Sequence, residues 1–292
     1  MRAAAIFGLS SSEPDLTPFQ RESSVSWLVS QPASSAEADA ILIFGGDGTV
    51  HRHLAQLVRL QLPVLVVPRG SGNDFARALN LRSVADAVAA WQQFISGRGS
   101  VKQIDLGVIT RLGESDATGT YFCCVGGVGL DSEIARRGNQ LPRWIRRRGG
   151  YALSLLPALL SFKPLLVKVA ASTGAIEIQH DGLAIVVAFA NAPTYGDGIK
   201  IAPRARLDDG KLDICVVRDM GKLRLLRRFP SVYSGSHLGI SEVKYFQTEV
   251  VRIETATPVD VYADGEYVCQ TPVEVRVEPA ALKVIIPAPD GR

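Results

Sequence analysis

Two glycine-rich loops in the first third of the chain carry residues suited to holding the phosphates of a nucleotide. Each loop follows an apolar run and precedes a helical pattern, so its glycines let the backbone turn sharply and approach a ligand closely. The N–H groups at the start of each following helix would then face an anion. Neither loop matches the GxxxxGK[ST] or GxGxxG pattern. The loop residues are Gly45, Gly46, Asp47, Gly48 and Thr49, and Gly70, Ser71, Gly72, Asn73 and Asp74.

An acidic residue in each loop indicates a bound cation. If the two preceding strands are parallel neighbours, both loops lie at the carboxyl edge of one sheet, where open α/β folds bind ligands. Asp47 and Asp74 would repel a bare triphosphate, but they suit a divalent cation that lies between them and the phosphates. One such loop is as often a plain strand-to-helix turn, whereas two together favour a nucleotide site.

The elements that position these loops alternate between strand and helix. Ala40–Phe44 and Val64–Val67 are short apolar runs typical of buried strands. Ser83 and Asp86 form a capping signature at the start of a further helix. This alternation predicts an α/β domain with a parallel sheet covered on both faces. The buried stripe predicted for the further helix is Val84, Val88, Trp91 and Ile95.

Beyond about residue 116 the pattern changes to strands separated by Asp-Gly turns. We expect an antiparallel β-sandwich with one helical insertion at Pro142–Phe162, and a last strand, Leu282–Ile286, that returns to the first domain. The predicted domains are residues 1–115 with 281–292, and residues 116–280. The strands expected in the second domain are Gly119–Val125, Ala175–His180, Ala184–Ala190, Lys211–Arg218, Val250–Glu254, Val259–Ala263 and Val273–Val277.

The composition limits the class of protein. Hydrophobic residues make up 47% and charged residues 21% of the 292 residues, which is typical of a globular protein. A formal charge of +3 is too small to indicate a nucleic-acid partner by itself. The four cysteines show no CxxC spacing for zinc and no disulfide-scaffold density, which favours a reduced, cytoplasmic compartment. No run reaches the roughly 18 apolar residues of a membrane span.

Five motifs occur in order along nearly the whole chain. They are GGDGT at 45–49, PRGSGNDFAR at 68–77, Val125–Arg136, Asn191–Lys211 and Asp264-Gly265-Glu266. Together they resemble the diacylglycerol kinase catalytic-domain family, which includes bacterial lipid kinases and sphingosine kinases and is distantly similar in fold to NAD kinases and phosphofructokinases. The resemblance implies a nucleotide-binding α/β domain, a β-sandwich lipid-binding domain and an active site in the cleft between them.

In the first domain the resemblance implies an ATP site. Asp47 would be central to it and to catalysis, Ser71 would contact the phosphates, and Asp74 would join the acidic network around Mg²⁺. The residues of the first motif that would hold ATP are Gly45, Gly46, Asp47, Gly48, Thr49, Val50 and His51.

In the second domain the resemblance implies a magnesium site and a proton acceptor. Asp209 resembles the magnesium-site aspartate, with the backbone carbonyls of Arg206 and Lys211 as further ligands. Asp264 resembles the carboxylate that accepts the proton of the lipid hydroxyl. An Asp-Gly turn by itself is more often a plain hairpin, so this role depends on the resemblance.

Two further residues of the second domain are predicted to bind substrate. Asp131 stands where sphingosine kinases have an acidic residue near the lipid head group. A helix N-terminal carboxylate stabilised by the helix dipole is an equal alternative for this residue. Asn191 opens the Asn-Ala-Pro-Thr-Tyr-Gly segment that matches another motif of the family.

The chain departs from the family pattern at three places. His51-Arg52 replaces the common Asn-Glu, and Arg52 either contacts phosphate or is a solvated helix residue. The segment Ser10-Ser11-Ser12 occupies the position of the usual Asn-Pro signature after the first strand. A helix that the family has after its second strand, here Val25–Ser30, is predicted to be absent.

A basic cluster beside an apolar run predicts contact with an anionic membrane surface. The apolar run is Tyr151–Phe162, and the alternative is that it only packs on the sandwich and lines a pocket. Peripheral association with the inner face of the membrane would follow from such contact. The cluster contains Arg136, Arg137, Arg143, Trp144, Arg146, Arg147 and Arg148.

The leading hypothesis is an enzyme that uses ATP and Mg²⁺ to phosphorylate a lipid hydroxyl, of the diacylglycerol or long-chain base type. A kinase of a soluble acceptor such as NAD is a second hypothesis. A third is a non-catalytic lipid- or nucleotide-binding protein, against which the four acidic residues Asp47, Asp74, Asp209 and Asp264 argue. The oligomeric state, including a homodimer, stays open.

Overall fold

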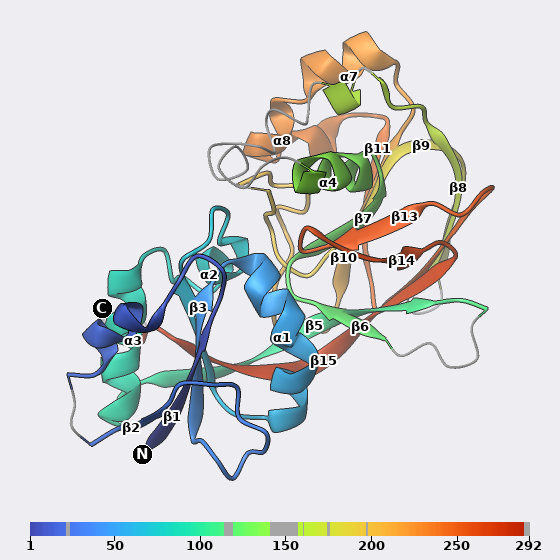
Figure 1. Cartoon of the computed structure of the whole chain (residues 1–292). Coiled ribbons are helices and arrows are strands. Elements are labelled where there is room, and N and C mark those ends of the chain that lie inside the picture. Colours follow the sequence, from blue (N-terminus) through green and yellow to red (C-terminus); the bar gives the residue numbers. More distant parts are fainter. Residues whose placement is uncertain are drawn as a thin grey trace. The chain divides into compact units, whose positions relative to one another are not determined.

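The computed structural model describes residues 1–21, 24–113, 119–140, 157–159, 161–173, 176–196 and 198–288. The chain forms two compact units. Unit 1 contains Met1–Asp105 and Pro279–Arg292, and unit 2 contains Leu106–Glu278. Strands β5 (Ser100–Arg111) and β15 (Val273–Ile286) each begin in one unit and end in the other (Figure 1).

Unit 1 contains the predicted parallel sheet. Strand β1 pairs in parallel with β2 and β3, β3 pairs with β4, and β4 pairs with the end of β15. Every residue of β3 is buried, as expected for a parallel strand covered on both faces. Helices α1 and α3 lie on opposite faces of this sheet (Figure 1). The bounds are β1 (Arg2–Phe7), β2 (Ser26–Leu28), β3 (Ala40–Gly45), β4 (Val64–Pro68), α1 (Asp47–Leu60), α2 (Asp74–Ala78) and α3 (Val84–Ile95).

Helix α3 begins at the predicted capping signature. The Asp86 N–H donates to Ser83 Oγ over 3.1 Å, and the Ser83 N–H donates to Asp86 Oδ2 over 2.8 Å. The predicted buried stripe is wrong in part, because Ala87, Ala90 and Trp91 are the buried residues of the helix. Small alanine side chains let the helix approach the sheet closely, which leaves the predicted valines and isoleucine half-buried at its sides.

The connection between β2 and β3 has no helix. Residues 29–39 are all described and form only turns and bends. The prediction that the usual helix is absent is therefore confirmed. A short 3-10 helix, η1 (Glu13–Phe19), instead follows β1 and packs Phe19 edge-on against Phe44 at 5.2 Å between ring centroids.

Unit 2 is an antiparallel β-structure around one core. Strand β9 is central, since it pairs with β7, β8 and β10. Val187, Phe189 and Ile214 belong to its fully buried core cluster. The strands are β6 (Thr120–Phe122), β7 (Val125–Gly129), β8 (Leu165–Thr173), β9 (Ile176–Ala190), β10 (Leu212–Arg218), β11 (Val243–Thr248), β12 (Val250–Thr255), β13 (Asp260–Ala263) and β14 (Glu266–Gln270).

The unit boundaries differ from those predicted at residues 115/116 and 280/281. The first lies inside β5, because Gly107–Ile109 pair with β6 in an antiparallel hairpin of unit 2. The second lies inside β15, which pairs with β12 through Val273–Arg276 and with Val64 through Val284. The last strand therefore returns to unit 1 as predicted, but as the end of one continuous strand.

Unit 2 has more helices than the single insertion that was predicted. A helical segment between β10 and β11 contradicts that prediction, and its Leu225, Phe229 and Val232 recur at helical spacing. Most of the predicted insertion at Pro142–Phe162 lies outside the described residues, as do Arg143 and Arg146–Arg148. Within the described residues, none of the helices is both long and apolar enough to cross a membrane. Among the described residues, the helices with given bounds are α4 (Leu130–Gln140), α7 (Lys222–Arg228), α8 (Ser231–Ser234) and η2 (Ser236–Gly239), and residues 157–159 are also helical.

Candidate functional site

The two glycine-rich loops of unit 1 lie against each other. Each follows one of the paired strands β3 and β4, and the Arg69 N–H donates to the Gly45 carbonyl over 3.0 Å. Gly46 and Gly70 face one another so closely that a Cβ on Gly70 would lie 2.4 Å from the Gly46 Cα. Both positions therefore need glycine. The loops form one backbone surface at the carboxyl edge of the sheet, where α1 and α2 begin.

Asp47 connects the first loop to the second. Its Oδ2 accepts the Asp74 N–H over 3.0 Å, and its Oδ1 accepts the Phe75 N–H over 2.9 Å. A carboxylate that caps the start of α2 in this way satisfies two N–H groups that the helix itself leaves unpaired. The structure thus gives Asp47 a role in positioning the second loop.

The second loop is also held by its own side chains. Asn73, in the left-handed region at φ 55°, exchanges two hydrogen bonds of 2.8 Å with the backbone of Gly70. Asp74 is 2% exposed and pairs with Arg77 over 3.1 Å. Arg77 also donates to the Gly72 carbonyl. Ser71 stays exposed at the tip of the loop, as a phosphate contact requires.

Not every predicted ATP-binding residue presents its side chain to a ligand. Thr49 and Val50 are buried, and a Cβ on Gly45 would lie 2.5 Å from the Thr49 side chain. These two residues therefore pack beneath the loop, while Gly46, Asp47, Gly48 and His51 remain partly exposed. Arg52 is exposed and donates from Nε to the Gly48 carbonyl over 2.9 Å, which favours the interpretation as a solvated helix residue.

The serine segment after β1, where the family signature is missing, supports both loops. Ser10 Oγ donates to the Arg69 carbonyl over 2.7 Å, and Ser11 Oγ donates to the Phe44 carbonyl over 2.5 Å. Arg69 also pairs with Asp15 over 2.6 Å. The sequence interpretation missed these contacts, although a run of hydroxyl side chains directly after a buried strand was a usable signal.

In unit 2, Asp264 lies at the turn between β13 and β14 with φ 50°, a left-handed conformation that aspartate tolerates. Its Oδ2 and Oδ1 accept the N–H groups of Cys123 and Cys124, each over 2.8 Å. The Cys123 thiol also donates to Oδ2 over 3.4 Å. The carboxylate is therefore fixed in orientation and partly exposed, which suits a group that accepts a proton.

The segment that fixes Asp264 is held from its other side by Asn191. Asn191 is fully buried; its backbone N–H donates to the Cys124 carbonyl over 2.8 Å and its Nδ2 to the Cys123 carbonyl over 3.2 Å. This burial favours a positioning role over the predicted contact with substrate. The Cys123 and Cys124 thiols come within 4.8 Å of an Asp264 oxygen, but sulfur ligands suit softer metals than magnesium.

A second carboxylate accompanies the predicted magnesium-site residue. Gln247 Nε2 donates to Asp209 Oδ2 over 3.3 Å and to Asp213 Oδ2 over 3.2 Å. Asp213 is fully buried, accepts the Tyr245 hydroxyl over 2.5 Å, and has its pKa raised by burial. The sequence interpretation did not select Asp213, although a lone carboxylate in the apolar strand β10 needs a buried partner.

These groups fit a hard divalent cation. The Asp209 Oδ1 accepts the Lys211 N–H over 3.2 Å, which closes the turn, and Arg206 and Lys211 are exposed. The donor set is oxygen only, as Mg²⁺ prefers. Asp209 with the Arg206 and Lys211 carbonyls would hold the ion, and Asp213 shares the Gln247 amide with Asp209.

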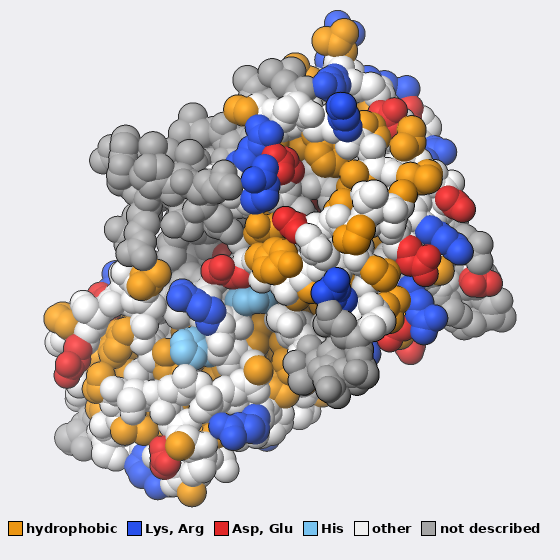
Figure 2. All heavy atoms as spheres, turned by 45° about the vertical axis from the view of Figure 1, so that its right-hand side comes forward, with side chains coloured by type: hydrophobic (Ala, Val, Ile, Leu, Met, Phe, Trp, Pro, Cys, Tyr) orange, Lys and Arg blue, Asp and Glu red, His pale blue; other side chains and the backbone are white. Residues whose placement is uncertain are grey.

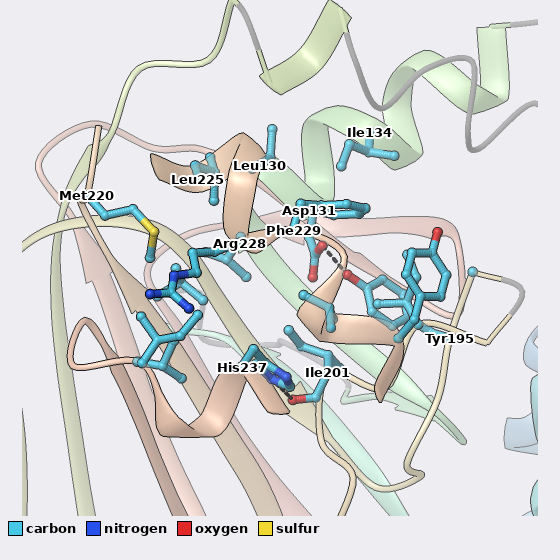
Figure 3. A pocket seen from close by; sticks show the side chains of 18 residues that line it. Leu130, Asp131, Ile134, Tyr195, Ile201, Met220, Leu225, Arg228, Phe229 and His237 are labelled. Carbon is cyan, nitrogen blue, oxygen red and sulfur yellow. Dashed lines mark hydrogen bonds between the residues drawn. The ribbon is translucent and has the colours of Figure 1, made fainter. Parts of the chain in front are cut away.

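Unit 2 contains an apolar cavity of about 260 Å³ between β9, α4 and the helices that follow β10 (Figure 3). Asp131 lies on its wall and accepts the Tyr195 hydroxyl. Burial raises the pKa of Asp131 to about 6, against a smaller opposite effect of the Tyr195 hydrogen bond. His237, also on the wall, contacts the Ile201 carbonyl over 3.1 Å through Nε2. Apolar residues that line the cavity include Leu130, Ile134, Ile199, Leu225, Phe229 and Val232.

Asp131 is thus a wall residue of this cavity. It opens α4, as the helix-terminus alternative requires, and it also faces the cavity, as the head-group hypothesis requires. A Cβ on Gly127 would lie 3.0 Å from its carboxylate, so the glycine in β7 makes room for this side chain.

The sequence of the chain matches two known protein-domain families. Residues 4–109 match the diacylglycerol kinase catalytic domain, and residues 125–286 match the YegS C-terminal NAD kinase beta sandwich-like domain. The second match covers more than half of the chain. The chain belongs to the diacylglycerol kinase catalytic-domain family. The predicted family, fold class and enzyme class, a lipid kinase, are therefore confirmed.

Individual relatives agree with this family. The chain is 34% identical over 249 residues to a diacylglycerol kinase of Mycobacterium tuberculosis, covering 85% of this chain and 77% of the relative. It is 27% identical over 244 residues to a diacylglycerol kinase of Bacillus subtilis, covering 80% and 73%. The crystal structure of a diacylglycerol kinase from Bacillus anthracis has the same fold, with a TM-score of 0.70, 18% identity and coverage of 98% and 96%.

Proposed function

We propose that this diacylglycerol kinase family member transfers the γ-phosphoryl group of ATP to the hydroxyl of a lipid whose apolar body binds in the cavity of unit 2. The observation that carries the proposal is the cavity itself. Its wall is largely aliphatic and aromatic, and it holds a few polar groups, among them the Asp131–Tyr195 pair. Apolar walls with a few fixed polar groups are typical of ligand pockets that bind and orient a greasy molecule.

The loop surface of unit 1 would bind ATP. Gly46 and Gly70 let phosphate oxygens approach the backbone, and Ser71 adds an exposed hydroxyl. Asp47, which fixes the start of α2, would keep that helix N-terminus aimed at the phosphates. Mg²⁺ supplies neutralisation of phosphate charge when it is bound. Asp74 would add to the negative charge near it.

Asp264 would accept the proton of the attacking hydroxyl. The two N–H groups of Cys123 and Cys124 keep its carboxylate in one orientation, which would let it receive that proton. A hydrogen bond from that hydroxyl to Asp264 would also turn the oxygen toward phosphorus. General-base help of this kind contributes about 10²- to 10⁴-fold in rate.

The acceptor would be a diacylglycerol or a long-chain base. The relatives cited above are named diacylglycerol kinases. Asp131 can receive either a lipid hydroxyl or the ammonium of a sphingoid base as a hydrogen-bond donor, so its contacts fit both classes. A soluble acceptor such as NAD is disfavoured, because most of the cavity wall offers it no hydrogen bonds. We further propose a cytoplasmic protein that meets its lipid at an anionic membrane surface.

The acceptor class is tested by offering several acceptors to the same preparation. Labelled ATP and Mg²⁺ are supplied with diacylglycerol or sphingosine in detergent micelles, or with NAD in solution. Label in one of the two lipids supports the proposal and names the class. Label in NAD, with none in either lipid, would refute it.

A further inference from the structure

A short basic helix beside the cavity has an apolar edge that is partly exposed. Helix α7 contains Lys222, Arg224, Arg227 and Arg228 and no acidic residue. None of its residues is buried; Leu223 is 81% exposed and Leu226 is 43% exposed. Figure 2 shows hydrophobic and basic side chains side by side at the top of unit 2, where Figure 1 places α7.

The two sides of α7 have different surroundings. Leu225, Arg228 and Phe229 line the apolar cavity (Figure 3), whereas Leu223 and Leu226, one turn apart, lie on the outer side. Tyr233, which also lines the cavity, is 47% exposed. Arg228 of α7, which lines the cavity as well, is also exposed, so the cavity reaches the surface beside α7.

We propose that the outer edge of α7, defined as Leu223, Leu226 and Arg227, docks on an anionic lipid bilayer and brings the cavity opening to the lipid. This rests on the proposed function, since a membrane is where a lipid acceptor is found. The charge of the helix is complementary to anionic head groups, and its exposed leucines enter the boundary between head groups and acyl chains. Arg224 pairs over 2.5 Å with Glu242, which lies at some distance in sequence from the outer edge of the helix.

This surface is separate from the segment in which the sequence predicts membrane contact. That segment, around Arg143 and Tyr151–Phe162, lies largely outside the described residues. Helix α7 has the composition of an interfacial helix on a smaller scale, with Leu223 and Leu226 on its outer side and cations around them. An acidic protein would satisfy the cations, but it would have no need for an adjacent apolar cavity.

The docking is tested with the full chain and no ATP, so the result does not depend on catalysis. Flotation measures the affinity of the chain for two kinds of vesicle. Neutral vesicles contain phosphatidylcholine alone, and in anionic vesicles about one lipid in three is phosphatidylglycerol. The variant is Leu223→Gln with Arg227→Gln, which leaves the cavity-lining residues intact. A matched control, Val29→Gln with Arg59→Gln, removes an exposed apolar residue and an arginine from unit 1.

We expect the wild type and the control to bind the anionic vesicles and to bind neutral vesicles more weakly. The α7 variant should bind anionic vesicles about tenfold or more weakly, because about one charge and one inserted leucine are lost. Its micellar kinase activity should stay within about twofold of wild type. If the proposed function fails but docking holds, vesicle binding persists with no lipid phosphorylation in micelles.

Three outcomes would overturn the docking proposal. The first is equal binding of the α7 variant and the wild type to anionic vesicles. The second is a wild type that binds no vesicle at all. The third is a wild type that does not bind vesicles but binds polyglutamate, with weaker polyglutamate binding by the α7 variant. This result would assign the surface to an acidic protein instead.

Discussion

At the scale of single residues, the carboxylate of Asp131 is in an unfavourable environment that a bound head group would relieve. Burial raises its pKa to about 6, from an ordinary value of 3.8. Burial disfavours the charged form, while the Tyr195 hydroxyl partly stabilises it. A lipid hydroxyl or ammonium that donates to this carboxylate would add the stabilisation that the apolar wall does not give.

The first prediction concerns the stability of Asp131→Asn as a function of pH. Below about pH 3 the carboxyl is protonated in the folded and unfolded states, so its ionisation has no effect on stability. Above about pH 7 it is ionised in both states, and its full cost of up to about 3 kcal/mol is present. The free energy of unfolding of Asp131→Asn should therefore exceed that of wild type most at about pH 7 and approach it as the pH falls to about 3.

Urea unfolding of both proteins at several pH values measures this difference. Tyr195→Phe is the companion variant, because loss of its hydrogen bond should move the stability change to higher pH. A difference between Asp131→Asn and wild type that does not vary with pH would contradict the assignment.

Residue types with a strong local signature were predictable from the sequence, and buried partners were not. Glycines and aspartates in the two loops stand out because few other residues fit such turns. Asp213 was missed, since its importance comes from Gln247 and Tyr245, which strand pairing of β10 with β11 brings alongside. No local pattern shows that pairing.

At the scale of elements, the close contact of the two loops makes a prediction about Gly70→Ala. The added Cβ would lie 2.4 Å from the Gly46 Cα, so the loops must separate. We expect ATP affinity to fall about tenfold or more, because the phosphate-facing N–H groups shift together. Gly239→Ala is the control, since a Cβ there meets nothing within 4 Å. Calorimetric ATP binding measures both, and an unchanged affinity in Gly70→Ala would be evidence against the loop site.

Asp47→Ala should affect stability and nucleotide binding together. It removes two charge-assisted hydrogen bonds to the start of α2, each contributing about 1.5–3 kcal/mol. Asp86→Ala removes a helix cap of α3 in the same unit and should cost only about 1 kcal/mol. Thermal unfolding with ATP titration tests this pair. The positioning role predicts weaker ATP binding for Asp47→Ala alone; equal effects of both variants on ATP affinity would argue against it.

At this scale the sequence predicted the helix caps and the positions of the strands, but it did not predict which side of a helix is buried. The Ser83–Asp86 capping box is local, so the sequence determines it. The buried side of α3 consists of Ala87, Ala90 and Trp91 because the helix packs close to the sheet, and hydrophobicity alone favours the larger neighbours instead. The helices after β10 were missed because their apolar residues alternate with arginines and resemble a solvated connection.

At the scale of the whole molecule, the two units bind two different substrates in the proposed function, and unit 1 is built from two separate segments of the chain. The family motifs predicted both units, because each motif marks one of them. The predicted boundaries differ from those of the units, since β5 and β15 run unbroken from one unit to the other and no turn signal marks the change. Where a strand continues from one unit into the next, the sequence contains no turn residues that would mark the boundary.

The division into units predicts that a substitution in the cavity changes only lipid binding. Val232→Trp places a large ring in the cavity and should raise the KM for the lipid about tenfold or more. The Kd for ATP should stay within about twofold, because the loops belong to unit 1. Steady-state kinetics with each substrate varied tests this. A matching loss of ATP affinity would show that the cavity is not a separate lipid site.

The central claim, that this chain phosphorylates a lipid with Asp264 as proton acceptor, is tested most directly by phosphate transfer from labelled ATP with Mg²⁺ to mixed lipids in micelles. Wild type is compared with Asp264→Asn and with Asp260→Asn, a carboxylate of the same hairpin that Gln270 holds over 3.0 Å. Asn has only one acceptor oxygen for the two N–H groups, so Asp264→Asn could lose stability. Thermal unfolding is therefore used to check that each variant is folded. The account predicts labelled lipid from wild type and Asp260→Asn, and a rate about 10²-fold or more lower for Asp264→Asn at unchanged ATP affinity. No labelled lipid from wild type, or equal rates for wild type and a folded Asp264→Asn, would contradict it.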